Sequence, residues 1–165
     1  MKQIAPGSTP IITPLGEQIT ELVAHLDAAQ YQLMVLLEEF DRNEEWGDRG
    51  INSCAHWLNV HCGMSTCAAR ERVRVARALP ELPLISRSFS EGQVSYSKVR
   101  AMTRVATPEN EDLLLNTALH GTASQLEKQV RYYRRYKRLT KLAEDNLSFS
   151  QRKVNLFMDE DDSWI

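Results

Sequence analysis

The chain has 165 residues and a mass of 18.9 kDa, enough for one domain that buries a hydrophobic core without disulfides or metal ions. Apolar residues make up 42% of it and charged residues 25%, a balance that excludes a disordered or collagen-like protein. The longest apolar run extends only from Leu33 to Leu37, whereas a membrane span needs roughly 20 apolar residues, so we expect no membrane partner.

Acidic and basic side chains are separated along the chain, although the net charge is only −2. Residues 1–50 hold nine acidic side chains against three basic ones, a net charge of −6. Residues 51–141 hold fifteen basic against seven acidic side chains, a net charge of +8, and residues 142–165 carry −4. The basic middle therefore favours either an anionic partner or neutralisation by the acidic ends.

The N-terminal residues and the cysteines together indicate a location. Three prolines interrupt residues 1–14, and no apolar stretch of about 7 to 15 residues forms there, so this segment lacks the pattern of a secretory signal peptide. Cys54, Cys62 and Cys67 are odd in number and close together, which favours reduced thiols over a disulfide framework. We therefore expect a cytoplasmic protein.

The segment from Leu15 to about Trp46 predicts a long amphipathic helix, preceded by Pro14 and ended by Gly47 and Gly50. Its apolar or small residues alternate at spacings of three and four: Ile19, Leu22, Leu26, Ala29, Leu33, Leu36 and Phe40. Further apolar residues widen this stripe: Val23, Met34 and Leu37. The stripe is broader than a coiled-coil seam, so we expect the helix to be the spine of the fold and to pack against several partners.

Shorter helices follow, each with its own cap or stop signal. Ser53 predicts the cap of a helix that ends near Gly63, and Ser65 the cap of one that stops at Pro80. The remaining expected helices cover about 80–91, closed by Gly92; about 95–106; 107–120, opened by Thr107, Pro108 and Glu109; and 122–145, opened by a Thr122–Gln125 capping box.

The end of the chain has a different period. Polar and apolar residues alternate from Arg152 to Met158, which predicts a strand, and Trp164 with Ile165 would begin a return strand. The fold class we expect is mainly α, with about seven helices around one core, a long first helix, and a truncated C-terminal β-hairpin. The expected division is a flexible segment at 1–14, a helical domain at 15–146 and the start of the hairpin at 147–165.

Several sequence blocks, in a fixed order, resemble a known family. They are Trp46, Gly50, Ser53, Trp57-Leu58, Gly63-Met64-Ser65, the run from Ala69 to Pro83, the run from Gly92 to Lys98, and the run from Arg104 to Glu111. The order and content of these blocks resemble the domain of unknown function 222, also called the thirteen-E-twelve repeat family, over most of the chain. In that family the helical region usually precedes an HNH endonuclease domain. The resemblance implies a DNA-handling protein and supplies no catalytic residue within the helical part.

The HNH site itself is absent from the sequence. His56, Asn59 and His61 spell a superficial H, N, H, but they fall within two turns of one expected helix. An HNH site needs a ββα element that presents the phosphate to a metal and a base, so we expect no catalytic residue, no metal and no cofactor. The chain is therefore expected not to be an enzyme, and a nuclease part would lie beyond Ile165.

Basic helix faces are the candidate site. The expected last helix carries the larger group, with Tyr132, Tyr133 and Tyr136 between the cations to pack the helix or to stack on bases. The candidate nucleic-acid-binding residues are Arg70, Arg74 and Arg77 on one helix, and Lys128, Arg131, Arg134, Arg135, Arg138 and Lys141 on the last one. The alternative is that both groups are solvated or are paired with the acidic first helix.

Other chemistry-bearing residues favour structural roles. A zinc site would draw on Cys54, His56, His61, Cys62 and Cys67, but their spacing is poor and favours small buried residues. The acids from Asp159 to Asp162 are typical of a solvated turn, and Trp46 and Trp57 of core anchors.

The function that we expect from the sequence is a non-catalytic accessory domain of an HNH-endonuclease-type protein that associates with DNA through its Arg and Lys helix faces. The alternative is a protein interaction module, or a self-association module that forms a homo-oligomer through the first helix.

Overall fold

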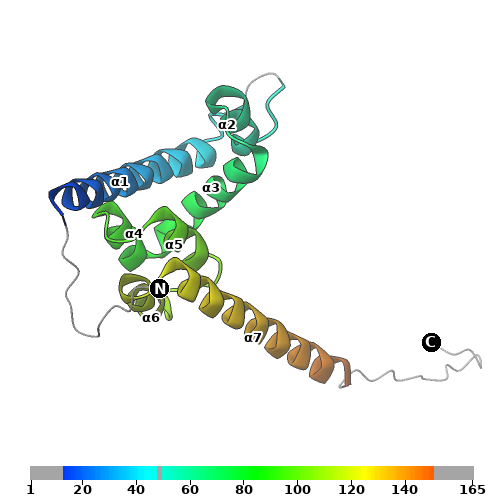
Figure 1. Ribbon diagram of the computed structural model, residues 1–165. Helices are drawn as coiled ribbons and strands as arrows, with labels where there is room; N and C mark the ends of the chain where they lie inside the picture. The colour runs from blue at the N-terminus through cyan, green and yellow to red at the C-terminus, as the bar shows by residue number, and fades with distance from the viewer. Residues whose placement is uncertain (1–12, 48–49, 151–165) are drawn as a thin grey trace, which may run out of the picture. The chain divides into compact units, whose positions relative to one another are not determined.

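The computed structural model describes residues 13–47 and 50–150, which form seven α-helices and one 3₁₀ helix and contain no strand (Figure 1). The helices are α1 (Pro14–Arg42), α2 (Cys54–Cys62), α3 (Thr66–Ala78), η1 (Leu79–Glu81), α4 (Pro83–Ser90), α5 (Tyr96–Met102), α6 (Glu111–His120) and α7 (Ala123–Ser150). The mainly α prediction is confirmed. Within the described ranges, no helix combines the length and the apolar content that crossing a bilayer requires.

The chain divides into two compact units, Met1–Val130 and Arg131–Ile165, and the division falls inside α7. The first unit holds α1 to α6, the first turns of α7 and the hydrophobic core. The largest fully buried apolar side chains of this core include Phe89, Met34, Leu58, Ile85, Met102, Leu114 and Leu126. The second unit holds the rest of α7 and so adds no further packed helix among the described residues.

Three predicted caps are confirmed. The Ser53 hydroxyl accepts a hydrogen bond from the His56 N–H at 3.1 Å, so α2 begins where the sequence indicated. The Ser65 hydroxyl caps α3 in the same way. At α7, the Thr122 N–H donates to Gln125 Oε1 at 2.8 Å while the Gln125 N–H donates to Thr122 Oγ1, which is the reciprocal capping box.

Three predicted helix boundaries are wrong, and one of them is the end of α5, which lies at Met102 rather than near residue 106. The first helix ends at Arg42 rather than near Trp46, because Asn43 closes it and Glu44 adopts a left-handed φ of 55°. The sixth helix begins at Glu111 rather than at Thr107. There the Asn110 side chain accepts from the Thr107 N–H at 2.8 Å and forms a turn before the helix starts.

The expected C-terminal hairpin receives no support. Helix α7 continues past the expected end at Asp145 to Ser150, so the first residues of the predicted hairpin segment, 147–150, are helical. The strand predicted at Arg152–Met158, the turn and the return strand lie outside the described residues.

The middle of α1 packs against the turn that joins α4 to α5. Gly92, at a φ of 69°, lies against the carbonyl oxygen of Ala24 so closely that a Cβ would overlap it. One turn further, the buried Asp27 carboxylate accepts a hydrogen bond from the Tyr96 N–H at 3.0 Å and thereby caps α5. Tyr31 then meets Phe89 edge to face, with ring centroids 5.8 Å apart.

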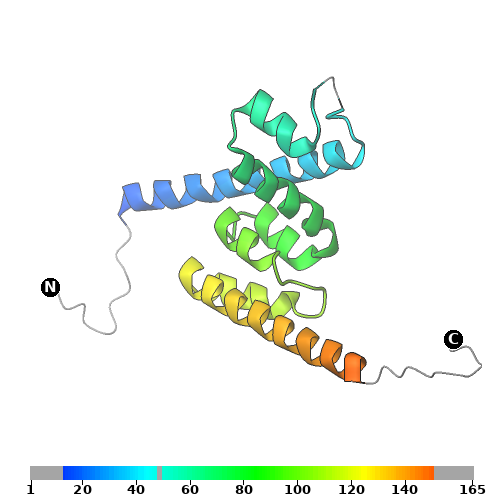
Figure 2. The ribbon, with the colours of Figure 1, turned by 90° about the vertical axis from the view of Figure 1, so that its right-hand side faces the viewer.

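The face that α1 buries is not the one that its apolar spacing indicated. Met34 and Leu37, which were expected only to widen the stripe, are buried together with Asp27. The stripe itself lies largely outside: Ile19 is 56%, Leu22 59%, Leu26 56% and Leu36 63% exposed. The first turns of α1, dark blue in Figure 2, extend beyond the helices on which α1 packs. The expectation that this stripe packs within the fold is therefore wrong for the described residues.

We expect the substitution Gly92→Ala to lower the free energy of unfolding by about 3 kcal/mol, measured by urea denaturation. The new methyl group would meet the Ala24 carbonyl as well as impose the cost of a left-handed residue with a side chain.

The matched control is Gly63→Ala. Gly63 has nearly the same φ, 65°, but nothing lies within 4 Å of its added Cβ, so only about 1 kcal/mol should be lost. Equal losses at the two positions would contradict the close contact between α1 and the α4–α5 turn.

Candidate nucleic-acid interface

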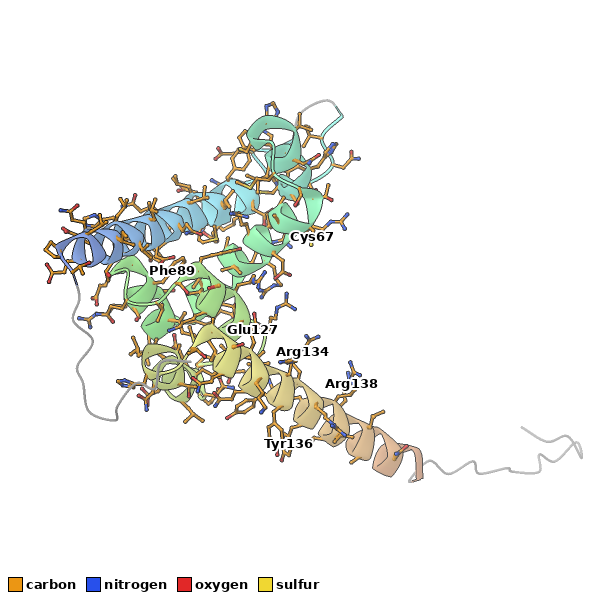
Figure 3. All side chains as sticks on the ribbon, in the orientation of Figure 1. Cys67, Phe89, Glu127, Arg134, Tyr136 and Arg138 are labelled. Carbon is orange, nitrogen blue, oxygen red and sulfur yellow. The ribbon has the colours of Figure 1, made fainter. Side chains whose placement is uncertain are left out.

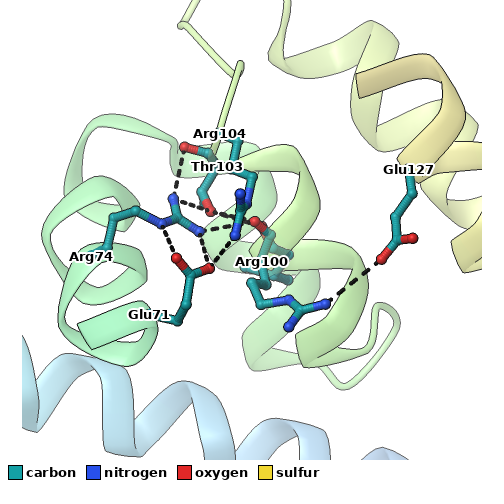
Figure 4. Close-up of polar contacts among 7 residues, drawn as sticks. Glu71, Arg74, Arg100, Thr103, Arg104 and Glu127 are labelled. Atoms are coloured by element: carbon teal, nitrogen blue, oxygen red, sulfur yellow. Dashed lines mark hydrogen bonds and ion pairs between the residues drawn. The ribbon is translucent and has the colours of Figure 1, made fainter. Parts of the chain in front are cut away.

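Arg74, on α3, makes its hydrogen bonds within the first unit. Its guanidinium donates to the Arg100 carbonyl at 3.0 Å, to the Thr103 carbonyl at 3.2 Å and to the Glu71 carboxylate (Figure 4). Arg104 donates at 2.6 Å to Oε2 of the same carboxylate, the oxygen that also accepts from Arg74 Nη2. Arg74 thus ties α3 to the C-terminal end of α5, where helix carbonyls attract cations.

The carboxylate of Glu71 is held ionised by these two arginines. Burial by itself would raise the pKa of Glu71, but the hydrogen bonds and positive charges of Arg74 and Arg104 outweigh it and lower that pKa below its ordinary 4.5. The same surface of the first unit also carries an ion pair between Arg100 and Glu127 at 3.6 Å.

Arg77 is paired with the acidic first helix. Its Nε and Nη2 donate to the two oxygens of Asp41 at 2.6 and 3.1 Å, a bidentate arrangement. The hydrogen bonds that Arg77 donates to Asp41 raise the pKa of Arg77 above its ordinary value. For this residue, neutralisation by α1, the alternative considered above, is what the structure shows.

Arg70 differs from its two neighbours on α3. It is exposed, and it lines a surface cavity of about 470 Å³ together with Ser53, Arg74 and Arg77. No ion pair involves Arg70 among the described residues. Of the predicted α3 stripe, Arg70 is the residue whose guanidinium is available to an incoming anion.

The cations of α7 are placed differently from those of α3. All of the predicted residues there are exposed, and none takes part in an ion pair within residues 13–47 and 50–150: Lys128, Arg131, Arg134, Arg135, Arg138 and Lys141. Arg131, Arg134, Arg135 and Arg138 border one open cavity of about 500 Å³ in the second unit. Helical spacing places these side chains on one face, which we call the α7 basic face.

The tyrosines of α7 do not share that face. Figure 3 shows Tyr136 on the side of the helix opposite to Arg134 and Arg138. Tyr132 and Tyr136 are 71% and 61% exposed, so neither is a buried residue of the second unit. A backbone bound along the arginines would not bring its bases onto Tyr136, which removes the expected combination of phosphate contact and stacking at that residue.

The cysteine and histidine cluster does not come together. In the part of the chain that the structure describes, no group of three or more His, Cys, Asp or Glu side chains is placed to hold a metal ion. Cys54 is buried, and burial first, then the charge of Asp41, raises the pKa of its thiol to about 11. Cys62 and Cys67 are exposed, contrary to the expectation of small buried residues. The acids at 159–162 lie outside the described residues.

The tryptophans are half-buried rather than central to the core. Trp57 packs edge to face on Phe40 with ring centroids 4.8 Å apart, and Trp46 has its indole nitrogen buried without a hydrogen-bond partner. The sequence reasoning missed the apolar groove between α1 and α2 that Trp57 lines, and it missed the interactions of Arg100 and Arg104. The helical spacing of Glu71 and Arg74 was a signal for part of that network.

We expect Glu71→Gln to lower the free energy of unfolding by about 1–2 kcal/mol at pH 7, because two arginines lose their anionic acceptor. The folded pKa lies below the ordinary value, so the stabilisation is fully present above about pH 4.5 and disappears as the pH falls through the folded pKa. Denaturation of both proteins from pH 7 to pH 3 should therefore give converging curves.

The control is Glu91→Gln, since Glu91 forms an exposed pair with Arg87 one helical turn away and accepts an exposed hydrogen bond from the Gln93 side chain. Its effect should stay within about 0.5 kcal/mol at every pH. A difference between wild type and Glu71→Gln that persists undiminished at pH 3 would contradict the ion-pair assignment.

Comparison with known proteins places the chain in a family. No curated protein and no solved structure is found to match it. A family model described as "Domain of unknown function (DUF222)" matches residues 16–145, a range that includes α2 to α6, nearly all of α1 and most of α7. The resemblance seen in the sequence blocks is thereby confirmed: the chain belongs to the DUF222 family.

Proposed function

We propose that this chain is a non-catalytic accessory module that binds nucleic acid through the α7 basic face. The observation that carries the proposal is that the four arginines of this face are exposed and no carboxylate of the described residues is paired with any of them. An unpaired row of arginines and lysines attracts a polyanion by releasing its condensed counterions.

The chemistry of the face favours contact with phosphates over contact with bases. Guanidinium groups on successive helical turns match a repeating anionic backbone, and Arg binds phosphate oxygens in a bidentate manner. The aromatic side chain of Tyr136 lies on the other side of the helix. We therefore propose binding that is independent of sequence and that weakens steeply as salt is added.

Arg70 is proposed as a second contact, whereas Arg74 and Arg77 are not. The guanidiniums of these two are already engaged, by backbone carbonyls and Glu71 in one case and by Asp41 in the other. Breaking either set of interactions would cost more free energy than one exposed phosphate contact would contribute.

The family supports a DNA-associated role in a larger assembly. The resemblance described above implies that this helical region usually precedes an HNH endonuclease domain, so we propose that catalysis belongs to such a partner domain and that this module positions it on DNA. A cytoplasmic location is part of the same proposal. Self-association, the alternative function, concerns another surface, that of the first helix.

The test is a fluorescence-polarisation titration of a labelled DNA duplex at several salt concentrations. The double variant Arg134→Gln, Arg138→Gln should weaken binding by about tenfold or more at low salt, and it should reduce the slope of log affinity against log salt by about 2. Changing the base sequence of the duplex should have little effect.

A matched control removes two cations elsewhere. Arg42 and Arg87 are exposed and each pairs with a carboxylate one turn away, so the double variant Arg42→Gln, Arg87→Gln has the same net charge as the test variant. It should bind nearly as wild type does. Equal weakening by the two double variants, or binding that does not respond to salt, would show that the α7 basic face is not the site.

A further inference from the structure

A largely exposed apolar seam runs along α1. It consists of Leu15, Ile19, Leu22, Leu26, Ala29, Leu33, Leu36 and Phe40, which alternate at spacings of four and three. Five of these side chains are 56% to 66% exposed, and the core is packed by a different face of the helix. Leucines and isoleucine at this spacing over three and a half heptads form the surface of a coiled coil. We call this set the α1 seam.

The two ends of the α1 seam have different surroundings. At the N-terminal end, every residue from Glu17 to Val23 is exposed, so this arm of the helix has no packing partner within the described residues. At the other end, the seam forms one wall of an apolar groove of about 460 Å³. Trp57 and Leu58 of α2, together with Met64, form the other wall.

We propose that two copies of this chain associate through the α1 seam as an antiparallel helix pair. In this arrangement the free N-terminal arm of each copy lies along the groove end of the other copy's α1. Among the described residues, the arm is an amphipathic helix whose apolar side has no partner, and the groove is an apolar surface without a cover, so each supplies what the other lacks. This inference concerns a face other than the proposed DNA site and does not depend on it.

An antiparallel register pairs the seam completely. When Ile19 lies opposite Leu36 of the second copy, the remaining layers are Leu15 with Phe40, Leu22 with Leu33, and Leu26 with Ala29. The small Ala29 then faces a leucine, which fills the layer. In a parallel pair Ala29 would face its own copy and leave a void, and Phe40 would have to pack against Phe40.

The positions that flank the seam also fit a second copy. In the antiparallel register, Gln18 lies beside Glu39 of the second copy, and His25 lies beside Gln32. Each pair can form a hydrogen bond, and neither brings like charges together. The acidic residues Glu17, Glu21 and Glu38 occupy outer positions of the helix, away from the seam.

The buried area sets the affinity that we expect. Covering the α1 seam and the groove in two copies removes roughly 1,000 Å² of surface from water, on the area scale for burying half-exposed leucine-sized side chains. This area lies at the lower end of specific interfaces, so the dimer should dissociate at micromolar concentrations. Some exposure of the seam in the isolated chain is consistent with that reversible association.

The experiment is size-exclusion chromatography with light scattering over a series from about 1 to 200 μM. The wild-type chain should change from its monomer mass of 18.9 kDa to twice that value. Leu22→Glu should raise the dissociation constant by about thirtyfold or more, because a carboxylate would be buried against Leu33 of the second copy. Leu22 is exposed, so the variant should keep the helical circular dichroism of the wild type.

The matched control is Val35→Glu. Val35 is on the same helix and is 47% exposed, but it lies outside the α1 seam, so the same charge there should leave the dissociation constant unchanged. A wild-type chain that stays monomeric throughout the series, or equal effects from Leu22→Glu and Val35→Glu, would overturn the proposal.

Cysteine cross-linking tests the orientation, in a chain with the exposed Cys62 and Cys67 replaced by serine. Ile19→Cys combined with Leu36→Cys should form a disulfide-linked dimer under mild oxidation. Ile19→Cys alone should not, because in the antiparallel register the two copies of position 19 lie about 25 Å apart along the axis. Efficient cross-linking by Ile19→Cys alone would show a parallel pair and overturn the antiparallel arrangement.

Discussion

The contact between the middle of α1 and the α4–α5 turn determines how the first unit is arranged. Gly92 lets the turn approach the Ala24 carbonyl, and Asp27 holds the first N–H of α5. These contacts fix which side of α1 faces the core. A helix that places Asp27 on its inner face also places Met34 and Leu37 there, because the three residues share that face. The same orientation of α1 leaves most of the α1 seam outside the core. A single backbone approach therefore decides both the core and the surface that α1 offers to another molecule.

The basic middle of the chain separates into two populations of cations. On α3, carboxylates and helix carbonyls lie within reach, so Arg74 and Arg77 become part of the framework that joins α1, α3 and α5. On α7, no described carboxylate pairs with the arginines and lysines. The charge excess seen in the sequence is thus a sum of internal stabilisation and available surface charge, and only the second part bears on a ligand.

Local signals in the sequence were sufficient to predict the helices. The caps at Ser53, Ser65 and Thr122 act within one turn, so their chemistry is visible in the sequence and the structure confirms it. The inward face of α1 depends instead on Gly92, which is far away in the chain, and no periodicity reveals such an approach. Helix α1 carries two sets of apolar residues, and the sequence favoured the more regularly spaced set as the one that faces the core. In the structure that set lies largely outside the core.

The candidate site, like the fold, could be predicted from the sequence only where the signals are local. The cationic spacing of α7 was evident, whereas the roles of Arg74 and Arg77 depend on Thr103, 29 positions away, and on Asp41, 36 positions away. Distant partners of this kind decide whether a guanidinium is free, and a helical wheel does not contain them. The position of Tyr136 opposite Arg134 and Arg138 follows from helical spacing, so it can be predicted from the sequence.

Glu71 has a consequence that extends past the stability of the fold. One carboxylate accepts from the guanidiniums of both Arg74 and Arg104, while the guanidinium of Arg100 pairs with Glu127. The negative charge of Glu71 offsets part of the positive charge of the Arg74 and Arg104 guanidiniums and so lowers the net positive charge on this edge of α3 and α5. Losing that single negative group would leave the guanidiniums of Arg74 and Arg104 without their shared acceptor, and under the proposed function this edge would become a second surface that attracts a polyanion.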